Sequence, residues 1–377
     1  MTIDSEIAVA APGAEIAVAG QWKLFWLKFR RHRLAVASLV VVILLYLTAA
    51  FAPFLAPFDP NKTNATFTYA PPQTLHLFHE GRFAPNVTGL AMTLNQESMR
   101  REFALDPEKP VFLDFLVPAP PYKLLGFIPM ETKLFGPRDA TPRTAMYLLG
   151  ADRLGRDMLS RVLTGAQISL SIGLVGVILS LVLGIAIGGV SGMIGGTVDT
   201  IIQRFIEFLR SIPTIPLWMG LAAAIPTAWP PLRTYFVITL IVSMIGWTGL
   251  AREVRGKFLA LRGEDFVTAA RLDGMSEAGI LVHHLVPSIA SHIIATLTLA
   301  IPVMILAETA LSFLGIGLQP PIISWGVLLQ EAQNIRAVSQ APWLLFVPSF
   351  AIVIAVLSLN FLGDGLRDAA DPYGHTG

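Results

Sequence analysis

Few residues of this chain have the types and spacing that chemistry requires. His76, His79 and Glu80 have a spacing suited to a metal site, but they lack the full H-E-x-x-H pattern of zinc hydrolases. The chain has no cysteine, which excludes thiolate nucleophiles and cysteine-based metal or iron–sulfur sites. The segment Gly256–Phe258 departs from the phosphate-binding pattern G-x-x-x-x-G-K-[ST]. We therefore expect no catalytic residue, no metal site and no cofactor in this chain.

Two carboxylates stand in otherwise apolar surroundings. Glu207 falls in the third of the membrane spans described below, and Glu308 falls in the fifth. A charged group is costly in lipid, so both side chains should face protein or water. We interpret them as structural or gating partners, and contact with a transported solute is the alternative.

The elements that must position these residues are membrane helices. Of the 377 residues, 54% are hydrophobic and 14% are charged, whereas soluble proteins have about 45–50% and about 25%. The mean hydropathy is +0.63. The net charge of +1 supplies no basic field for a nucleic acid, so no nucleic-acid partner is expected. The composition indicates a polytopic membrane protein whose partner is the lipid bilayer.

Six runs without Asp, Glu, Lys or Arg are long enough to cross a bilayer, which takes about 20 apolar residues. The uncharged stretch Thr309–Gln330 is divided by Pro320-Pro321 and is interpreted as a re-entrant or surface loop. The sequence therefore predicts an all-α protein with six transmembrane helices. The runs lie between Arg33 and Asp59, between Arg161 and Asp199, on either side of Arg233, before Glu308, and between Arg336 and Asp364.

Basic residues predict the orientation. Clusters at Lys23–Arg33 and Arg252–Arg271 favour the cytoplasm, and six crossings return both termini to that side. The long polar segment that follows the first span then lies outside. The expected parts are a cytoplasmic tail 1–33, a first helix 34–57, an extracytoplasmic insert and linker 58–160, a five-helix core 161–370 with a cytoplasmic coupling loop 252–287, and a cytoplasmic tail 371–377.

Two segments have spacing that predicts packing. Gly184, Gly188, Gly192 and Gly196 form a small-residue stripe that suits close helix packing in lipid. Gly263–Gly274 is predicted to be a short helix, since acidic residues lie in its first turn, Arg271 lies in its last turn, and Gly274 suits a left-handed cap. Its alanines would leave part of the surface flat. Such a helix could dock into a groove on a soluble partner, or be a plain amphipathic loop helix.

The same loop resembles a known family. Thr268–Gly274, the nine residues Met275–His283 and then His284–Pro287 are similar to the E-A-A-x3-G-x9-I-x-L-P signature of the permease subunits of ABC importers. The alanines, the glycine and the proline match the signature. Thr268 replaces its glutamate, His284 its isoleucine and Val286 its leucine.

Other blocks resemble the dipeptide/oligopeptide/nickel permeases within this family. The basic tail, the first span and Ala56–Pro60 are similar to the C-type member of the permease pair. The remaining similar blocks are Leu149–Arg161, Leu311–Gly317, Pro320-Pro321 with Ser324–Gly326, Ala341–Trp343, and Asn360–Asp368 with Asp371-Pro372.

The resemblance implies a type I ABC importer transmembrane domain in a bacterial inner membrane, supplying half of a pathway for di- or oligopeptides. It implies a B-type permease, two ATPase subunits or domains carrying ATP and magnesium, and an extracytoplasmic solute-binding protein as partners. Nickel, opines and oligosaccharides are alternative solutes. The residues expected to couple to the ATPase are Glu264, Asp265, Thr268, Ala269, Ala270, Arg271, Gly274 and Pro287.

The segment from about Leu75 to Ala145 has no counterpart in short members of that family. We expect it to cover the outer mouth or to contact the solute-binding protein, and a passive insertion is the alternative. An ion-coupled secondary transporter and a non-transporting receptor or scaffold remain as functions of other classes. The first predicts uptake without an ATPase, and the second predicts no co-purifying ATPase.

Overall fold

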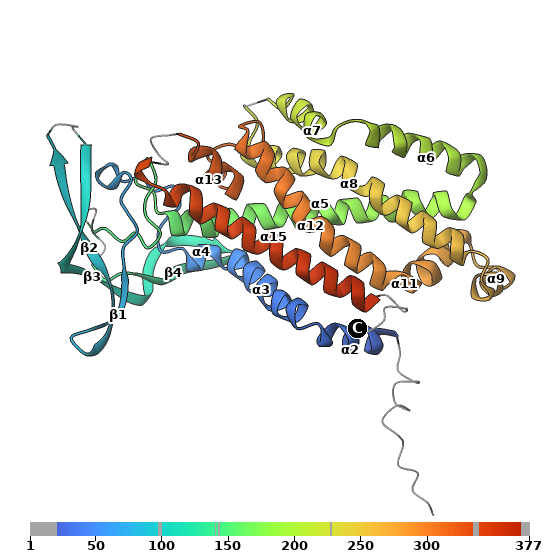
Figure 1. The fold of residues 1–377 in the computed structure, drawn as a ribbon, viewed down its shortest axis with the longest axis horizontal. Coiled ribbons are helices and arrows are strands. Elements are labelled where there is room, and N and C mark those ends of the chain that lie inside the picture. Colours follow the sequence, from blue (N-terminus) through green and yellow to red (C-terminus); the bar gives the residue numbers. More distant parts are fainter. Residues whose placement is uncertain are drawn as a thin grey trace, which may run out of the picture.

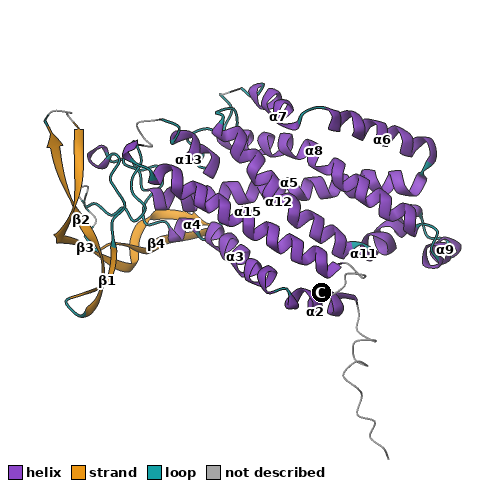
Figure 2. Ribbon diagram, in the orientation of Figure 1, coloured by secondary structure: helices purple, strands orange, loops and turns teal. Residues whose placement is uncertain are grey.

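The structure is a computed structural model that describes residues 21–96, 100–139, 141, 144–226, 228–334 and 339–370. Most of the predicted N-terminal tail, the whole C-terminal tail and Arg336 lie outside the described residues. Within them, a long bundle of helices ends in a small β-sheet (Figure 1). Figure 2 shows the strands gathered at that one end.

Five helices of the described chain are long and apolar enough to cross a membrane. Helix α5 lies centrally and packs along α8 and α12, while α15 packs on α3 and α12. Buried apolar side chains from these helices form the main core. The five are α3 (Arg33–Ala50), α5 (Met158–Ile194), α8 (Pro231–Leu261), α12 (Ala290–Phe313) and α15 (Trp343–Ala370).

The predicted third span is not a single long helix, which corrects the expected count of six. Its place is taken by α6 (Gly196–Ser211) and the short apolar α7 (Thr214–Ala223). The chain breaks between them at Ile212, which is extended because the following Pro213 disfavours helical geometry there. Glu207 therefore lies on α6, which also carries Asp199 and two arginines, and not on an apolar span.

The glycine stripe packs as predicted over three of its four positions. A Cβ atom on Gly192 would come within 2.9 Å of the Phe258 side chain of α8, and Gly184 and Gly188 face α8 equally closely. The prediction is wrong for Gly196, which has open space around it and a φ of +57° in the turn between α5 and α6. The stripe thus explains how α5 approaches α8, and it ends at the turn.

The insert is a β-sheet, so the all-α prediction is wrong for this part. Its four antiparallel strands have the order β1-β2-β3-β4. The turn Glu80-Gly81 has positive φ at both residues, which matches the twist of a two-residue hairpin. Strand β3 pairs with β2 in its first half and with β4 in its second. The strands are β1 (Leu75–His79), β2 (Arg82–Asn95), β3 (Arg100–Leu124) and β4 (Ile128–Pro137).

The short elements lie at the two ends of the bundle. At the sheet end are α4 (Ala52–Leu55), the 3₁₀ turn Ala65–Phe67 and α13 (Trp325–Glu331). The loop expected over Thr309–Gln330 is confirmed only for residues 314–324, since the ends of that stretch belong to α12 and α13; the Pro320-Pro321 peptide bond is cis. At the other end lie α2 (Gln21–Arg31), the end of α15 and α9 (Asp265–Leu272) (Figure 1). The elements that follow α9 also lie at this end: α10 (Glu277–Ile280), the π-helical turn Leu281–Leu285 and α11 (Val286–Ser288).

Candidate functional site

The predicted helix of the coupling loop is present as α9, at the end of the bundle away from the sheet (Figure 1). Glu264 is the extended residue that precedes it, and Asp265 lies in its first turn. Gly274 has a φ of +80°, and the amide of Met275 donates to the carbonyl of Ala270 at 3.1 Å. This hydrogen bond and the left-handed glycine confirm the predicted cap.

Helix α9 presents two different faces. Val267 is fully buried and Ala270 is 6% exposed, and both pack in an apolar cluster with Phe258 of α8 and Leu285. The prediction that Ala269 and Ala270 share one flat surface is therefore wrong, because Ala270 points inward and Ala269 outward. Since successive residues of a helix differ by about 100°, neighbours need not share a face.

The outward face combines small and apolar side chains. Thr268 and Ala269 are exposed there. Phe266 is 41% exposed and Leu272 is 83% exposed. Exposed apolar groups next to small ones favour a docking surface for another protein. We call residues Phe266, Thr268, Ala269 and Leu272 the α9 face.

Arg271 ties α9 to the segment that follows. Its Nε donates to Glu277 Oε1 at 2.8 Å, and its Nη1 donates to the Arg262 carbonyl at 3.3 Å. The hydrogen bonds from Arg271 lower the pKa of Glu277 below its usual range. Pro287 lies exposed in α11, after the π-helical turn. The predicted coupling residues from Glu264 to Gly274 thus form one compact unit, and Pro287 lies where the chain turns into α12.

Glu308 is completely buried on α12, so the prediction that it faces protein or water is confirmed on the protein side. Three serine hydroxyls donate to its carboxylate: Ser312 at 2.7 Å, Ser324 at 2.7 Å and Ser169 at 3.3 Å. The same hydroxyls accept backbone amides of Leu318, Val327 and Trp325. Glu308 therefore joins α5, α12 and the start of α13.

Glu207 has different surroundings. Its side chain is 49% exposed on α6 and pairs with Arg204 one turn earlier at 2.8 Å. Exposed pairs of this kind stabilise a helix only slightly. The structure does not bring Glu207 and Glu308 together, so the two acidic residues do not form one site within this chain.

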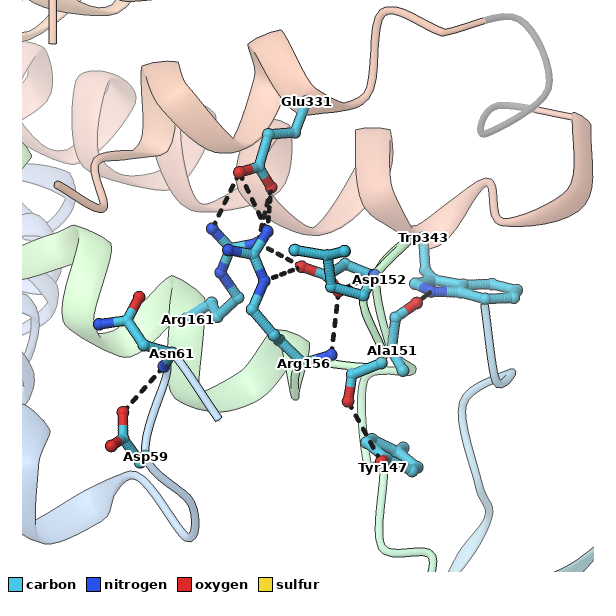
Figure 3. Close-up of polar contacts among 11 residues, drawn as sticks. Asp59, Asn61, Tyr147, Ala151, Asp152, Arg156, Arg161, Glu331 and Trp343 are labelled. Carbon is cyan, nitrogen blue, oxygen red and sulfur yellow. Dashed lines mark hydrogen bonds and ion pairs between the residues drawn. The ribbon is translucent and has the colours of Figure 1, made fainter. Parts of the chain in front are cut away.

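A buried ionic cluster at the sheet end was missed by the sequence analysis (Figure 3). Arg156 and Arg161 both contact Glu331 of α13, at 2.9 and 2.6 Å, and both also contact Asp152. The Arg161 side chain is 1% exposed. Burial alone would raise the pKa of Glu331, but hydrogen bonds and charge from the two arginines lower it. The spacing of Asp152 and Arg156 hinted at a local pair, while nothing in the sequence pointed to Glu331.

A second missed ion pair lies at the opposite end of the bundle. Arg255 of α8 contacts Asp199 of α6 at 2.5 Å, and Ser191 of α5 also donates to Asp199. This pair joins three helices next to α9. The two histidines of the insert that have metal-like spacing contact different neighbours: His76 contacts Thr88 at 3.1 Å, and the His79 ring packs on Phe112.

These features define a class: a multi-span helical membrane protein with the exposed α9 face at one end and a β-sheet at the other. Residues 180–373 match the family model described as "binding-protein-dependent transport system inner membrane component". Residues 20–72 match the N-terminal transmembrane domain of oligopeptide transport permease C. The chain belongs to the family of binding-protein-dependent transport system inner membrane components.

Individual relatives agree with this placement. The chain is 29% identical to the oligopeptide transport system permease protein OppC of Bacillus subtilis over 351 residues, which cover 93% of this chain and 89% of that protein. It is 38% identical to OppC of Haemophilus influenzae over 60% of this chain and 70% of that protein. It is 37% identical to the dipeptide transport system permease protein DppC of Bacillus subtilis over 61% and 70%.

Proposed function

We propose that this chain is one of two permease subunits of an ATP-driven, binding-protein-dependent peptide importer, and that it carries out no chemistry itself. The observation that carries the proposal is that α9 has one exposed face, while its opposite face packs against the helices of the bundle through Val267 and Ala270. The names of the relatives, which are oligopeptide and dipeptide permeases, support peptides as the solute. Nickel, opines and oligosaccharides remain the alternatives within this class.

The proposed orientation puts α9, α2 and the end of α15 in the cytoplasm and the sheet outside. The basic clusters Lys23–Arg33 and Arg252–Arg271 lie at the α9 end, as the charge rule requires. Helices α6 and α7 together would then make the third crossing, since they lead from the α9 end back toward the sheet end (Figure 1). The protein is proposed to be a multi-pass component of the bacterial inner membrane with both termini inside.

The proposed mechanism transmits movement as a rigid body. When two partner ATPases close on ATP and magnesium, a protein docked on the α9 face displaces α9. Val267 and Ala270 anchor α9 to an apolar cluster that includes Phe258 of α8 and Ile293 of α12. The displacement therefore reaches two membrane helices directly. It can shift the equilibrium between inward and outward states only if the docking contacts differ between them.

The proposed docking of an ATPase is tested by placing a charge on the α9 face. Ala269→Glu places a carboxylate where the ATPase would cover it, which typically costs about 2–5 kcal/mol of binding. We expect ATP-dependent peptide uptake in proteoliposomes, and co-purification of the ATPase, to fall by more than about tenfold. The matched control is Ala104→Glu on β3, which is also exposed but lies on the sheet.

Normal uptake and normal ATPase recovery with Ala269→Glu, at normal expression, would overturn the docking assignment. Uptake by this chain without any ATPase would establish the ion-coupled transporter instead. Binding of labelled peptides, nickel, an opine and an oligosaccharide to the cognate solute-binding protein distinguishes the solute classes.

A further inference from the structure

The hairpin between β3 and β4 ends in an uncharged apolar tip. Residues Leu124–Met130 read LLGFIPM, with Lys123 and Glu131 on either side. Phe127 is 72% exposed, Leu125 is 47% exposed and Ile128 is 38% exposed. A continuous apolar cluster of this kind, projecting from a small sheet, indicates a surface that another phase or molecule covers.

The hairpin lies against the part of the chain that enters the membrane. Lys133 Nζ donates to the carbonyls of Ala56 and Phe58 at 2.7 and 3.0 Å, which fixes the middle of β4 just after α4. Figure 1 shows β4 beside α4, while β1 occupies the opposite edge of the sheet. The tip is therefore held next to the outer end of the first membrane helix.

A groove between the hairpin and the bundle shows where the hairpin lies along helix α5. Its walls include Tyr122 on the hairpin and both Thr164 and Gln167 on α5. Those α5 residues lie about two turns after Met158, where α5 begins. Tyr122 pairs with Met130, at the base of the tip. The hairpin thus lies beside the first turns of α5. Its apolar tip extends beyond the Tyr122–Met130 pair.

We propose that the tip Leu124–Met130 inserts into the lipid–water interface of the outer leaflet and anchors the sheet to the membrane. The occupant is the lipid surface because the groove under the hairpin includes Pro53 of α4, which directly follows α3. Helix α3 is an apolar helix with exposed leucines, since Leu44 is 56% exposed and Leu47 is 48% exposed. Of the five apolar helices, α3 is the least buried within the chain. This inference rests on the proposed orientation, with the sheet outside.

The residues at the base of the tip suit an interface. Tyr122 donates to the Thr132 carbonyl at 2.6 Å, and Lys123 is exposed beside it. Aromatic and lysine side chains of this kind lie at the headgroup level, where an apolar body and a polar end are both satisfied. The turn also limits the depth, since backbone groups that are not paired within the hairpin must stay near water.

The experiment uses the absence of cysteine from this chain. Phe127→Cys is labelled with an environment-sensitive fluorophore in the assembled transporter in nanodiscs, and lipids spin-labelled at shallow or deep chain positions serve as quenchers. We expect quenching at least about twofold stronger than at Phe78→Cys, with the shallow quencher more effective than the deep one. Phe78 is the matched control because it is also aromatic, 65% exposed and on the opposite edge strand.

Leu44→Cys on α3 provides the lipid-facing reference, and wild-type chain taken through the same labelling gives the background. Ile128→Cys replaces Phe127→Cys if that variant does not assemble. Equal, weak quenching at both hairpins overturns the proposal. So does a Phe127→Cys thiol that a bifunctional reagent crosslinks to a partner subunit while its fluorophore-labelled form escapes lipid quenching. A membrane-impermeant thiol reagent on Phe78→Cys in sealed vesicles tests the sidedness separately, so failure of the orientation is distinguished from failure of the anchor.

Discussion

At the scale of single residues, burial determines what role a side chain can have and what a substitution there would test. Ala269 and Ala270 are neighbours in sequence, yet one is exposed and the other is packed against the bundle. A charge at Ala270 would therefore disrupt the fold of the loop, whereas a charge at Ala269 reports on docking. The two glutamates predicted to lie in membrane spans differ in the same way, since Glu308 is enclosed by serines and Glu207 is exposed on α6.

Replacing Glu308 by alanine should destabilise the protein strongly. Three serine hydroxyls would lose their common acceptor inside the bundle, and a cavity would remain. Each buried polar group left unsatisfied costs about 1–3 kcal/mol, so we expect a loss of several kcal/mol. The measurement is the thermal unfolding of the detergent-purified protein.

Glu207→Ala is the matched control for this change. It removes the same side chain from an exposed position, where substitutions usually change stability by less than about 0.5 kcal/mol. Equal effects of the two substitutions would show that Glu308 does not hold the three elements together.

At the scale of elements, sequence spacing predicted helices better than strands. The apolar runs around α3, α5, α8, α12 and α15 were found because a membrane helix needs a long uncharged stretch. The cap of α9 was predicted from Gly274. The sheet was missed because its strands include prolines, such as Pro107, Pro110 and Pro118 of β3, which are unusual in strands. The split between α6 and α7 was missed because uncharged length alone does not reveal a proline break.

The ionic cluster between the start of α5 and α13 should be essential for stability. Glu331→Ala removes one of the two carboxylates that the buried Arg156 and Arg161 share and leaves Asp152 alone to neutralise both. Breaking a buried ion pair by removing one partner costs about 3–5 kcal/mol. Glu131→Ala on β4, where the side chain is exposed, is the control. Chemical denaturation of the purified variants measures the difference.

The effect of Glu331 should depend on pH. The arginines lower the pKa of Glu331 in the folded protein, so the cluster stabilises the fold above the carboxyl's ordinary range. That contribution is lost as the pH falls through the lowered pKa. The stability difference between wild type and Glu331→Ala should therefore narrow in strong acid. A difference that stays constant, or widens, would contradict the assigned role.

At the scale of the whole molecule, the two ends of the bundle are built for different surroundings. One end carries α9 and both basic clusters, and the other carries the sheet (Figure 1). The buried ionic cluster lies between the start of α5 and α13 (Figure 3). The sequence predicted this difference between the two ends, because the positions of a few basic residues along the chain indicate which ends of the helices lie together. That inference needs no knowledge of how the side chains pack. The pairing of Glu331 with distant arginines could not be predicted in that way, since it arises only when α13 folds back on α5.

The polarity depends on the third crossing, which α6 and α7 must make together. If they do, the turn after α7 lies outside and the turn before α6 lies inside. Ala228→Cys, exposed after α7, should react with a membrane-impermeant thiol reagent added to intact cells, whereas Thr197→Cys, exposed at the start of α6, should react only after permeabilisation. Because the chain has no cysteine of its own, each signal belongs to one position. If both cysteines reacted from the same side, α6 and α7 would lie on the membrane surface, and five crossings would leave the two termini on opposite sides.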